Sequence, residues 1–518
     1  MAFFSAAFFG FVIIFLIIHH LAGEMFPRYQ WVVRLLAGLS FFTYLSGIKI
    51  IFLIASALTV WSGALLIHQV GANGRIYRKS AGLSPEEKKA AKQKCRRTQR
   101  AYAAAIVIFN IALLVLVKYF LPVASHPIAL PLGISFYSLM AVSYIIDVYG
   151  EKYEPQANFG KLLLYLCWFP QLIQGPINRY DLVEKDLYEP FRLHAPEFRY
   201  AFYMFLFGAV KKYALADLLA PAVNMCLNNN SQDKPGAYVF FGALLFAIEQ
   251  YADFSGGIDM SMGISLLFGV RMNENFKQPY FSDSLAAFWR RWHISLGSFM
   301  RDYVFYPFVT TKPVSKMTKA VSKKFGAHAG RALTGGISNL IVFVLVGLWH
   351  GPQKHYIIWG LYNGLIIAIS DALSPLASRI NAFLHIREDG KGMHIFRIVR
   401  TFLIVVFAGY FDVIGRVRTG AACFINTFLH FDLPKGITMI GELFTGGTVS
   451  VQAFSAAALS LVLLVINSVI KERGGSVLEP LTVKRFYLRW IVYFALFGLL
   501  LYSFAVSSGI RGFMYAAF

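Results

Sequence analysis

Long apolar stretches separated by short polar and basic segments dominate this chain. Many windows of about 20 residues carry almost no charge, and that length crosses about 30 Å of hydrocarbon. Within these windows polar and apolar residues do not alternate, so the pattern favours helices over transmembrane strands. It predicts membrane spans near 3–22, 31–46, 49–70, 101–121, 128–148, 199–220, 237–254, 337–349, 355–374, 396–414, 451–470 and 489–508.

Three further hydrophobic stretches, 160–177, 257–270 and 284–310, are interrupted by proline, glycine and charged residues. Irregular backbone at membrane depth must be covered by protein, so we expect re-entrant or buried helices there. The predicted fold class is an all-α polytopic membrane protein of about 11–14 helices, with the re-entrant or buried helices around a central tunnel or funnel.

Composition supports a membrane protein, because 57% of the 518 residues are hydrophobic and 16% are aromatic. The net charge of +22 lies mostly in the segments between apolar stretches. This is the pattern of the positive-inside rule, so we expect contact with membrane lipid and no nucleic-acid partner. The four cysteines match no metal or redox motif, and we interpret them as unpaired.

The segment 71–100 is strongly basic and is expected to be a cytosolic loop. Within it, Ser84 and Pro85 followed by acidic residues predict the start of a short surface helix. A later basic segment, between Lys471 and Arg489, is also expected to be cytosolic. The last span then runs outward, which places the tail 509–518 on the extracytoplasmic side.

Two histidines are the strongest candidates for chemistry. His293 lies in FWRRWHISL and His350 in FVLVGLWHG, directly after Trp292 and Trp349. A charged side chain at membrane depth costs roughly 2.5 kcal/mol or more, so an ionisable residue there indicates function. His350 is followed by Gly351-Pro352, which predicts a helix end, and a neutral imidazole there can act as a base near pH 7. The alternative is a buried histidine bonded to a backbone carbonyl.

The segment 250–308 is rich in charged residues although it is half apolar. Buried polar groups must be paired, so we expect Asp253 and Asp259 to accept hydrogen bonds from Arg290, Arg291 or backbone amides. The two arginines could alternatively hold an anionic donor or extend toward lipid phosphate.

A helix is expected to begin in the stretch Ser282–Ser284. On this helix Trp289 and His293 are four positions apart and are expected to share a face.

These strings together resemble the membrane-bound O-acyltransferase family. More narrowly, they resemble the bacterial branch that includes the alginate O-acetylation protein and the D-alanyl transfer protein of teichoic acids. Further matching strings are PLGISFYSL (131–139), WFPQLIQGPINRY (168–180), YADFSGGIDMSMGISLLFG (251–269), ENFKQPY (274–280) and WGLYNG (359–364).

The resemblance implies that His350 is the main catalytic residue and that His293 lines the same tunnel. We expect substrate contacts from Trp292, Trp349, Arg290, Arg291 and Asp253. It also implies an acyltransferase core over 126–375, preceded by N-terminal membrane helices (1–125) and followed by C-terminal helices (376–518).

The sequence Phe513-Met514-Tyr515-Ala516-Ala517-Phe518 resembles the F-x-Y-x-x-F ending of some proteins in these envelope acylation systems. There the tyrosine is thought to take the acyl group, which implies Tyr515 as an acyl carrier. The alternative is an interfacial aromatic residue at the outer end of a span.

The resemblance thus implies a membrane O-acyltransferase of the bacterial cytoplasmic (inner) membrane. It would move an acyl group, with acetyl expected, from a cytosolic acyl-CoA or acyl-carrier-protein thioester to an envelope polysaccharide. No bound cofactor or metal is expected, and an extracytoplasmic acyltransferase- or esterase-like partner would complete the transfer. D-alanyl transfer to teichoic acid, a lipid-directed acyltransferase and a polysaccharide transporter are the alternatives, although we see no internal repeat of the kind many transporters have.

Overall fold

Helices make up nearly all of the regular structure. The computed structural model describes residues 5–80, 82–120, 130–476, 486–507, 509 and 511–512. Within these ranges the β-type pairing is a single isolated bridge between Phe276 and Trp292. The all-α class is therefore confirmed. The chain divides into two compact units, one formed by Met1–Ala201 with Ser261–Asn273, and the other by Phe202–Met260 with Glu274–Ala517.

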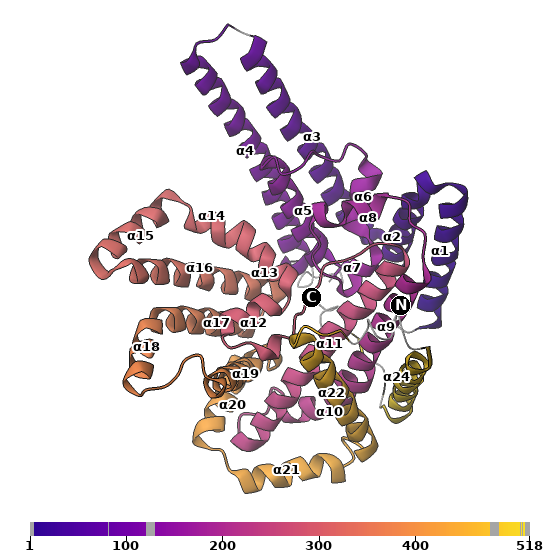
Figure 1. Ribbon diagram of the computed structural model, residues 1–518, viewed down its shortest axis with the longest axis vertical. Helices are drawn as coiled ribbons and strands as arrows, with labels where there is room; N and C mark the ends of the chain where they lie inside the picture. Colours follow the sequence, from indigo (N-terminus) through magenta and orange to yellow (C-terminus); the bar gives the residue numbers. More distant parts are fainter. Residues whose placement is uncertain are drawn as a thin grey trace. The chain divides into compact units, whose positions relative to one another are not determined.

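The first unit contains helices from the N-terminal part of the chain, some of which are drawn in indigo and purple in Figure 1. A π-helical turn, η3 (Leu116–Phe120), follows α4. The α-helices are α1 (Ala6–Met25), α2 (Gln30–Ser46), α3 (Ile50–Ser80), α4 (Pro85–Val115), α5 (Ile134–Tyr149), α6 (Phe159–Cys167), α7 (Phe169–Gln174) and α8 (Tyr180–Tyr188).

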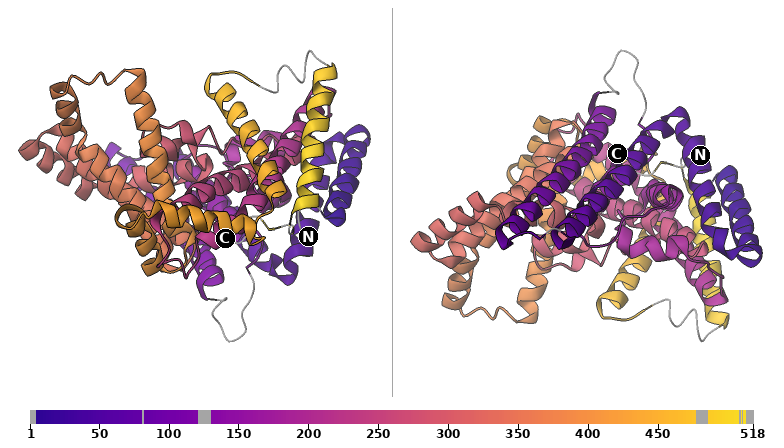
Figure 2. Two further views of the ribbon diagram at one scale, coloured as in Figure 1. Left: turned by 90° about the horizontal axis from the view of Figure 1, so that it is seen from below. Right: turned by 90° about the horizontal axis from the view of Figure 1, so that it is seen from above.

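Helices α3 and α4 form a long hairpin and run side by side in Figures 1 and 2. The segment 71–100, expected to be a loop, is almost entirely helical, because α3 continues to Ser80 and α4 begins at Pro85. Its alanine, lysine, arginine, glutamate and glutamine residues are strong helix formers, so both helices extend beyond their apolar parts. The predicted start at Ser84 is confirmed: its Oγ accepts from Glu87 N at 3.3 Å, and the Glu87 carboxylate accepts from Ser84 N at 2.8 Å.

The second unit contains the remaining helices, and α9 (Ala195–Ala209) and α11 (Gly236–Leu267) each continue across the boundary between units. Two π-helical segments, η5 (Val210–Ala216) and η7 (Arg301–Phe305), interrupt its helices. The other α-helices are α10 (Asp217–Cys226), α12 (Leu285–Arg291), α13 (Ile294–Met300), α14 (Tyr306–Val309), α15 (Lys312–Phe325), α16 (Ala327–His350), α17 (Lys354–Ala372), α18 (Ser374–Phe383), α19 (Lys391–Val413), α20 (Val417–Leu429), α21 (Leu433–Thr445), α22 (Val451–Glu472) and α24 (Phe486–Val506).

Helix α11 corrects one expectation, because the predicted span 237–254 and the interrupted stretch 257–270 form largely one continuous helix. Gly256 does not break it, since it serves close packing against the end of α9. A Cβ atom at Gly256 would lie 2.7 Å from the carbonyl oxygen of Gly208, and one at Gly208 would lie 2.6 Å from that of Gly256. The interruptions expected within 160–177 and 284–310 are confirmed by the breaks between α6 and α7 and between α12 and α14.

Seven helices in the described part of the chain are long and apolar enough to cross a membrane. The pair α17 and α18, bent by 54°, raises this number to eight if it counts as one span. The molecule is therefore a multi-pass membrane protein. The predicted span 199–220 is instead divided among α9, η5 and α10, where two adjacent lysines and Pro221 interrupt the apolar pattern.

Helices α16 and α17 form a tight hairpin within the second unit (Figure 1). Two glycines allow this close approach. A Cβ at Gly347 would lie 2.4 Å from the carbonyl oxygen of Tyr356, and one at Gly360 would lie 2.3 Å from that of Phe343. The hairpin therefore fixes the position of His350, the last residue of α16.

Candidate functional site

His293 lies in a break between two short helices. The helix start predicted in 282–284 is confirmed at Ser284, whose Oγ accepts from Ala287 N at 3.3 Å. However, α12 ends at Arg291, and His293 is the N-cap of α13 with a left-handed backbone (φ 46°). The expectation that Trp289 and His293 share one helix is therefore wrong. A left-handed non-glycine residue costs roughly 1–2 kcal/mol, so the surrounding structure must hold it in place.

Asn275 provides much of that support. Its Oδ1 lies 3.2 Å from His293 Nδ1 and accepts from Ser295 N at 3.0 Å and from Ser295 Oγ at 2.9 Å. Because the backbone N–H of Ser295 can only donate, the Asn275 atom is an acceptor, and Nδ1 of a neutral His293 must donate to it. This contact places the lone pair of the ring on Nε2.

Backbone hydrogen bonds also hold the break between α12 and α13 in place. Ile294 N donates to Asn275 O at 3.0 Å, and Lys277 N donates to Arg291 O at 2.9 Å. The isolated bridge lies between these two bonds and brings Phe276 against Trp292, with ring centroids 5.0 Å apart. The segment before α12 therefore sets the orientation of the residues that follow it.

His350 ends α16, and Gly351 follows as the C-cap, so the predicted helix end is confirmed. Its ring centroid lies 5.5 Å from that of Trp359 and 5.7 Å from that of Tyr356, both on α17. On the other side Trp349 lies 5.1 Å from His350 and 6.0 Å from His293. Both histidines are almost fully buried, with 6% and 3% exposure respectively.

His293 and His350 line one cavity of about 530 Å³ in the second unit. Its walls are mainly apolar and aromatic, and Trp289 in the wall donates its Nε1 to Asn363 Oδ1 at 3.2 Å. The lining residues with polar side-chain atoms are Gln250, Trp289, Arg290, Trp292, His293, Ser298, Arg301, Tyr306, Asn339, His350, Trp359, Asn363 and Asp412. An apolar cavity with a few convergent polar groups is typical of a ligand or active site.

Arg290 and Arg291, which could hold an anionic donor, differ in their surroundings. Arg290 lines the cavity together with Trp292. Arg291 instead pairs with Glu472 at 2.9 Å and donates to Gln278 O at 3.3 Å. Trp349 contacts both histidine rings but is not among the cavity-lining residues of the described structure.

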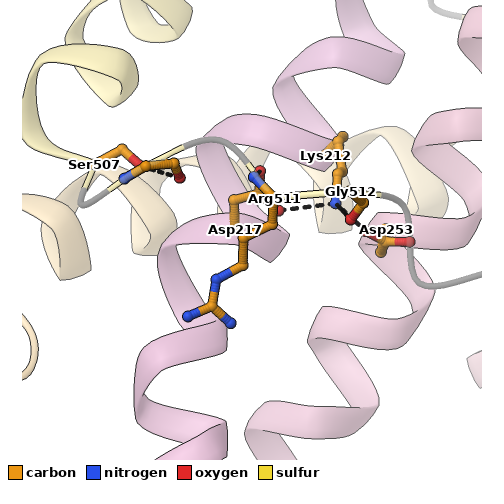
Figure 3. Close-up of polar contacts among 7 residues, drawn as sticks. Lys212, Asp217, Asp253, Ser507, Arg511 and Gly512 are labelled. Atoms are coloured by element: carbon orange, nitrogen blue, oxygen red, sulfur yellow. Dashed lines mark hydrogen bonds and ion pairs between the residues drawn. The ribbon is translucent and has the colours of Figure 1, made fainter. Parts of the chain in front are cut away.

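Asp253 does not bond to either arginine in the described structure, which corrects that expectation. It pairs with Lys212, and Asp259 pairs with Lys211 at 2.6 Å (Figure 3 for Asp253). Tyr515 lies outside the described residues. Among the described residues, no group of three or more His, Cys, Asp or Glu side chains could hold a metal ion.

Sequence reasoning missed three polar residues of this region, Asn275, Gln250 and Asp412. Asn275 lies within the quoted string ENFKQPY but was not singled out, because nothing local shows that it meets His293. Gln250, on α11, donates to Asp412 at the end of α19, and both line the cavity. Asp412 within a predicted span was a usable signal, since an acidic residue at such depth requires a partner.

The fold and the cavity define a class: a multi-pass helical membrane protein with two buried histidines facing one apolar cavity. Comparison with known proteins finds a matching family. Residues 154–411, which include both histidines, match the model of the membrane-bound O-acyltransferase family.

Individual relatives agree with this match. The chain is 32% identical over 369 residues to the probable alginate O-acetylase of Pseudomonas fluorescens, covering 70% of this chain and 65% of that protein. It is 26% identical to the peptidoglycan O-acetyltransferase of Helicobacter pylori, covering 70% of this chain and 68% of that protein. It is 29% identical to the teichoic acid D-alanyltransferase of Bacillus subtilis, covering 46% of this chain and 58% of that protein. The chain thus spans less than two thirds of the alginate relative.

Proposed function

We propose that this protein is a membrane O-acyltransferase that moves an acyl group, acetyl in the first instance, from a cytosolic thioester toward a cell-envelope polysaccharide. The observation that carries the proposal is the pair His293 and His350, which line one buried cavity within the segment that matches the family. The relatives bear the names of enzymes acting on alginate, peptidoglycan and teichoic acid, and these support an envelope polymer as final acceptor.

In the proposed reaction, His350 is the general base and Tyr515 the first acceptor. A phenol with a pKa near 10 is a weak nucleophile while protonated, so its proton must be removed as it attacks. His350 takes the Tyr515 proton as the phenol oxygen bonds to the thioester carbonyl carbon. The carbon–sulfur bond then breaks, and the proton passes from His350 to the departing thiolate. The products are an aryl ester on Tyr515 and a free thiol.

The second histidine has a different proposed role. Burial lowers the pKa of His293 to about 3, so its ring is neutral at pH 7 and is a weak base there. Catalytic bases work best with a pKa near the operating pH, so the base role is not proposed for His293. His293, with Nδ1 held by Asn275, orients or polarises the thioester instead. Arg290 and Trp292, which line the cavity, bind the donor in this scheme.

The remaining components of the proposal follow from the chemistry. The donor is acyl-CoA or an acyl carrier protein, since each supplies a thioester. An aryl ester is still reactive, because phenolate is a fair leaving group, so an extracytoplasmic partner enzyme can pass the acyl group to a polysaccharide hydroxyl. The protein then lies in the bacterial inner membrane with Tyr515 on the extracytoplasmic side.

D-alanyl transfer to teichoic acid is the second candidate, favoured by the similarity to the Bacillus subtilis enzyme. The chemistry at the thioester is the same, and only the acyl group and acceptor differ. The mass of an adduct on Tyr515 separates the two candidates directly.

Polymer acylation in cells tests the proposal. Tyr515→Phe is expected to abolish ester formation on the envelope polysaccharide, and His350→Ala is expected to do the same. Tyr487→Phe is the matched control, because Tyr487 is 82% exposed at the start of α24. Normal polymer acylation in a folded, correctly inserted Tyr515→Phe protein would remove the carrier role.

A further inference from the structure

A buried ion cluster in the second unit has no part in the chemistry above. Lys212, on the π-helical segment η5, pairs with Asp217 at 2.8 Å and with Asp253 of α11. Their side chains are only 1%, 4% and 4% exposed. π-Helical segments inside longer helices frequently occur at functional sites. The single ammonium group of Lys212 faces two carboxylates, so the cluster is more than a simple ion pair that neutralises itself.

The same cluster binds the backbone of the segment after the last helix (Figure 3). Lys212 Nζ donates to the carbonyl oxygen of Gly512 at 2.9 Å. Asp217 uses one oxygen for Lys212 and the other, Oδ2, to accept from Arg511 N at 3.3 Å. An ammonium group has three N–H donors, and these are matched here by Asp217, Asp253 and Gly512. Figure 3 also shows the guanidinium of Arg511 pointing away from Lys212, so backbone groups make these contacts.

Two features bring the segment after α24 to this cluster: the packing of α24 against η5 and a turn that follows α24. Helix α24 packs against η5, with the Phe504 and Tyr213 rings 5.4 Å apart. It ends at Val506, and Ser507 then closes a turn by donating from Oγ to Gly509 O at 2.9 Å and accepting from Gly509 N at 3.2 Å.

The cluster also lies beside the cavity. Phe246 and Gln250 line the cavity from α11, and Asp253 follows at the helical spacing that keeps it on the same face. The next residue, Phe254, packs edge-on against His293 with ring centroids 4.9 Å apart. One element therefore connects the ion cluster to the wall that holds His293.

We infer that Lys212, Asp217 and Asp253 form a binding site for an extended peptide backbone, and that its ligand is the chain's own segment Arg511–Gly512. As a positioning site it anchors the C-terminal segment so that Tyr515 meets the thioester, an inference that rests on the proposed function. Tyr515 follows Gly512 by three residues, and three extended residues span at most about 11 Å. Fixing Gly512 thus limits how far the Cα atom of Tyr515 can lie from the cluster.

Trypsin cleavage between Arg511 and Gly512 can test this inference. Trypsin cleaves after arginine and binds its substrate as an extended segment, so a segment held by the cluster is protected from it. The purified full-length protein is treated with trypsin, and release of the peptide Gly512–Phe518 is followed by mass spectrometry. Lys212→Met is expected to accelerate this release by about tenfold or more, because hydrogen bonds to charged groups are lost. The rate of Tyr515 acylation by a thioester donor is expected to fall in the same variant.

Lys211→Met is the matched control. Lys211 is the neighbouring buried lysine on η5, and it pairs with Asp259 and Ser255 instead of the tail. It is expected to release the peptide at the parental rate. Equal release rates in the parent, Lys211→Met and Lys212→Met would overturn the inference. Faster release in Lys212→Met, combined with no acyl group on Tyr515 in the parent, would support the binding site and refute the proposed function.

A second variant covers the case in which Lys212→Met does not fold. Arg511→Pro changes the exposed segment instead of the core and removes the amide hydrogen that Asp217 accepts. It is expected to lower Tyr515 acylation and to speed chymotryptic release of the last residues, with an unchanged unfolding temperature. Parental acylation and parental protection in Arg511→Pro would overturn the inference.

Discussion

Replacing Asn275 with alanine tests how His293 is held. The substitution removes the shared acceptor of His293 Nδ1, Ser295 N and Ser295 Oγ. The hydroxyl can rotate to another acceptor, but the ring N–H and the backbone N–H lose theirs. A buried donor without a partner costs about 1–3 kcal/mol, and water entering the adjacent cavity reduces that cost, so we take about 2 kcal/mol in total.

If the same loss appears in the transition state, about 2 kcal/mol corresponds to roughly a 30-fold slower acyl transfer. The assay is the single-turnover rate of acyl transfer from a thioester to Tyr515 by purified protein, measured together with the unfolding temperature. Asn110→Ala is the control, because Asn110 is a buried asparagine that hydrogen-bonds Ser56 Oγ and Ile106 O but does not line the cavity. It should lose stability and keep its rate. A parental rate in Asn275→Ala would refute the positioning role of Asn275.

Three further predictions use contrasts within the chain. Gly347→Ala is expected to lower the unfolding temperature, since overpacking costs about 1–3 kcal/mol. A Cβ atom at Gly335, on the same helix, would meet no atom within 4 Å, so Gly335→Ala should be neutral or stabilising. Equal effects of the two in a thermal unfolding scan would contradict the tight hairpin. Because the pKa of His293 is about 3, its ring does not titrate between about pH 5 and 8, so His293→Gln should slow transfer without moving the acid limb of the pH–rate profile. A shifted acid limb in the pH–rate profile of His293→Gln would contradict this prediction. Arg290→Ala should raise KM for the thioester more than Arg291→Ala, whose partly exposed ion pair contributes about 0–1 kcal/mol, and the reverse order would assign donor binding to Arg291.

The sequence predicted features that depend on local signals. The end of α16 at His350 follows from Gly351-Pro352, and the start of α4 follows from Ser84 and its capping acid. The apolar stretches near the chain's start and end also became long helices. These features need only neighbouring residues, so hydrophobic pattern and capping chemistry suffice to find them.

Features that depend on distant partners were not predicted correctly. The stretch FWRRWHISL contains no helix breaker, yet the helix breaks before His293 because residues 275–277 pair with the break. Asp253 was assigned to Arg290, Arg291 or backbone amides, but its partner is Lys212, 41 positions earlier and on another helical segment. Lys211 and Lys212 within an apolar stretch were a usable signal, since charges at membrane depth seek opposite charges. The segment 71–100 was taken as a loop because its charge outweighed its helix propensity.

Mass spectrometry of the C-terminal peptide tests the central claim most directly. The protein is purified from membranes or incubated with a thioester donor, and Tyr515 is examined in the parent and in His350→Ala. We expect an acyl adduct on Tyr515 in the parent, with a mass that identifies the acyl group, and none in the variant. An unmodified Tyr515 in a parent protein that actively acylates its polymer would contradict the account, as would an undiminished adduct in His350→Ala.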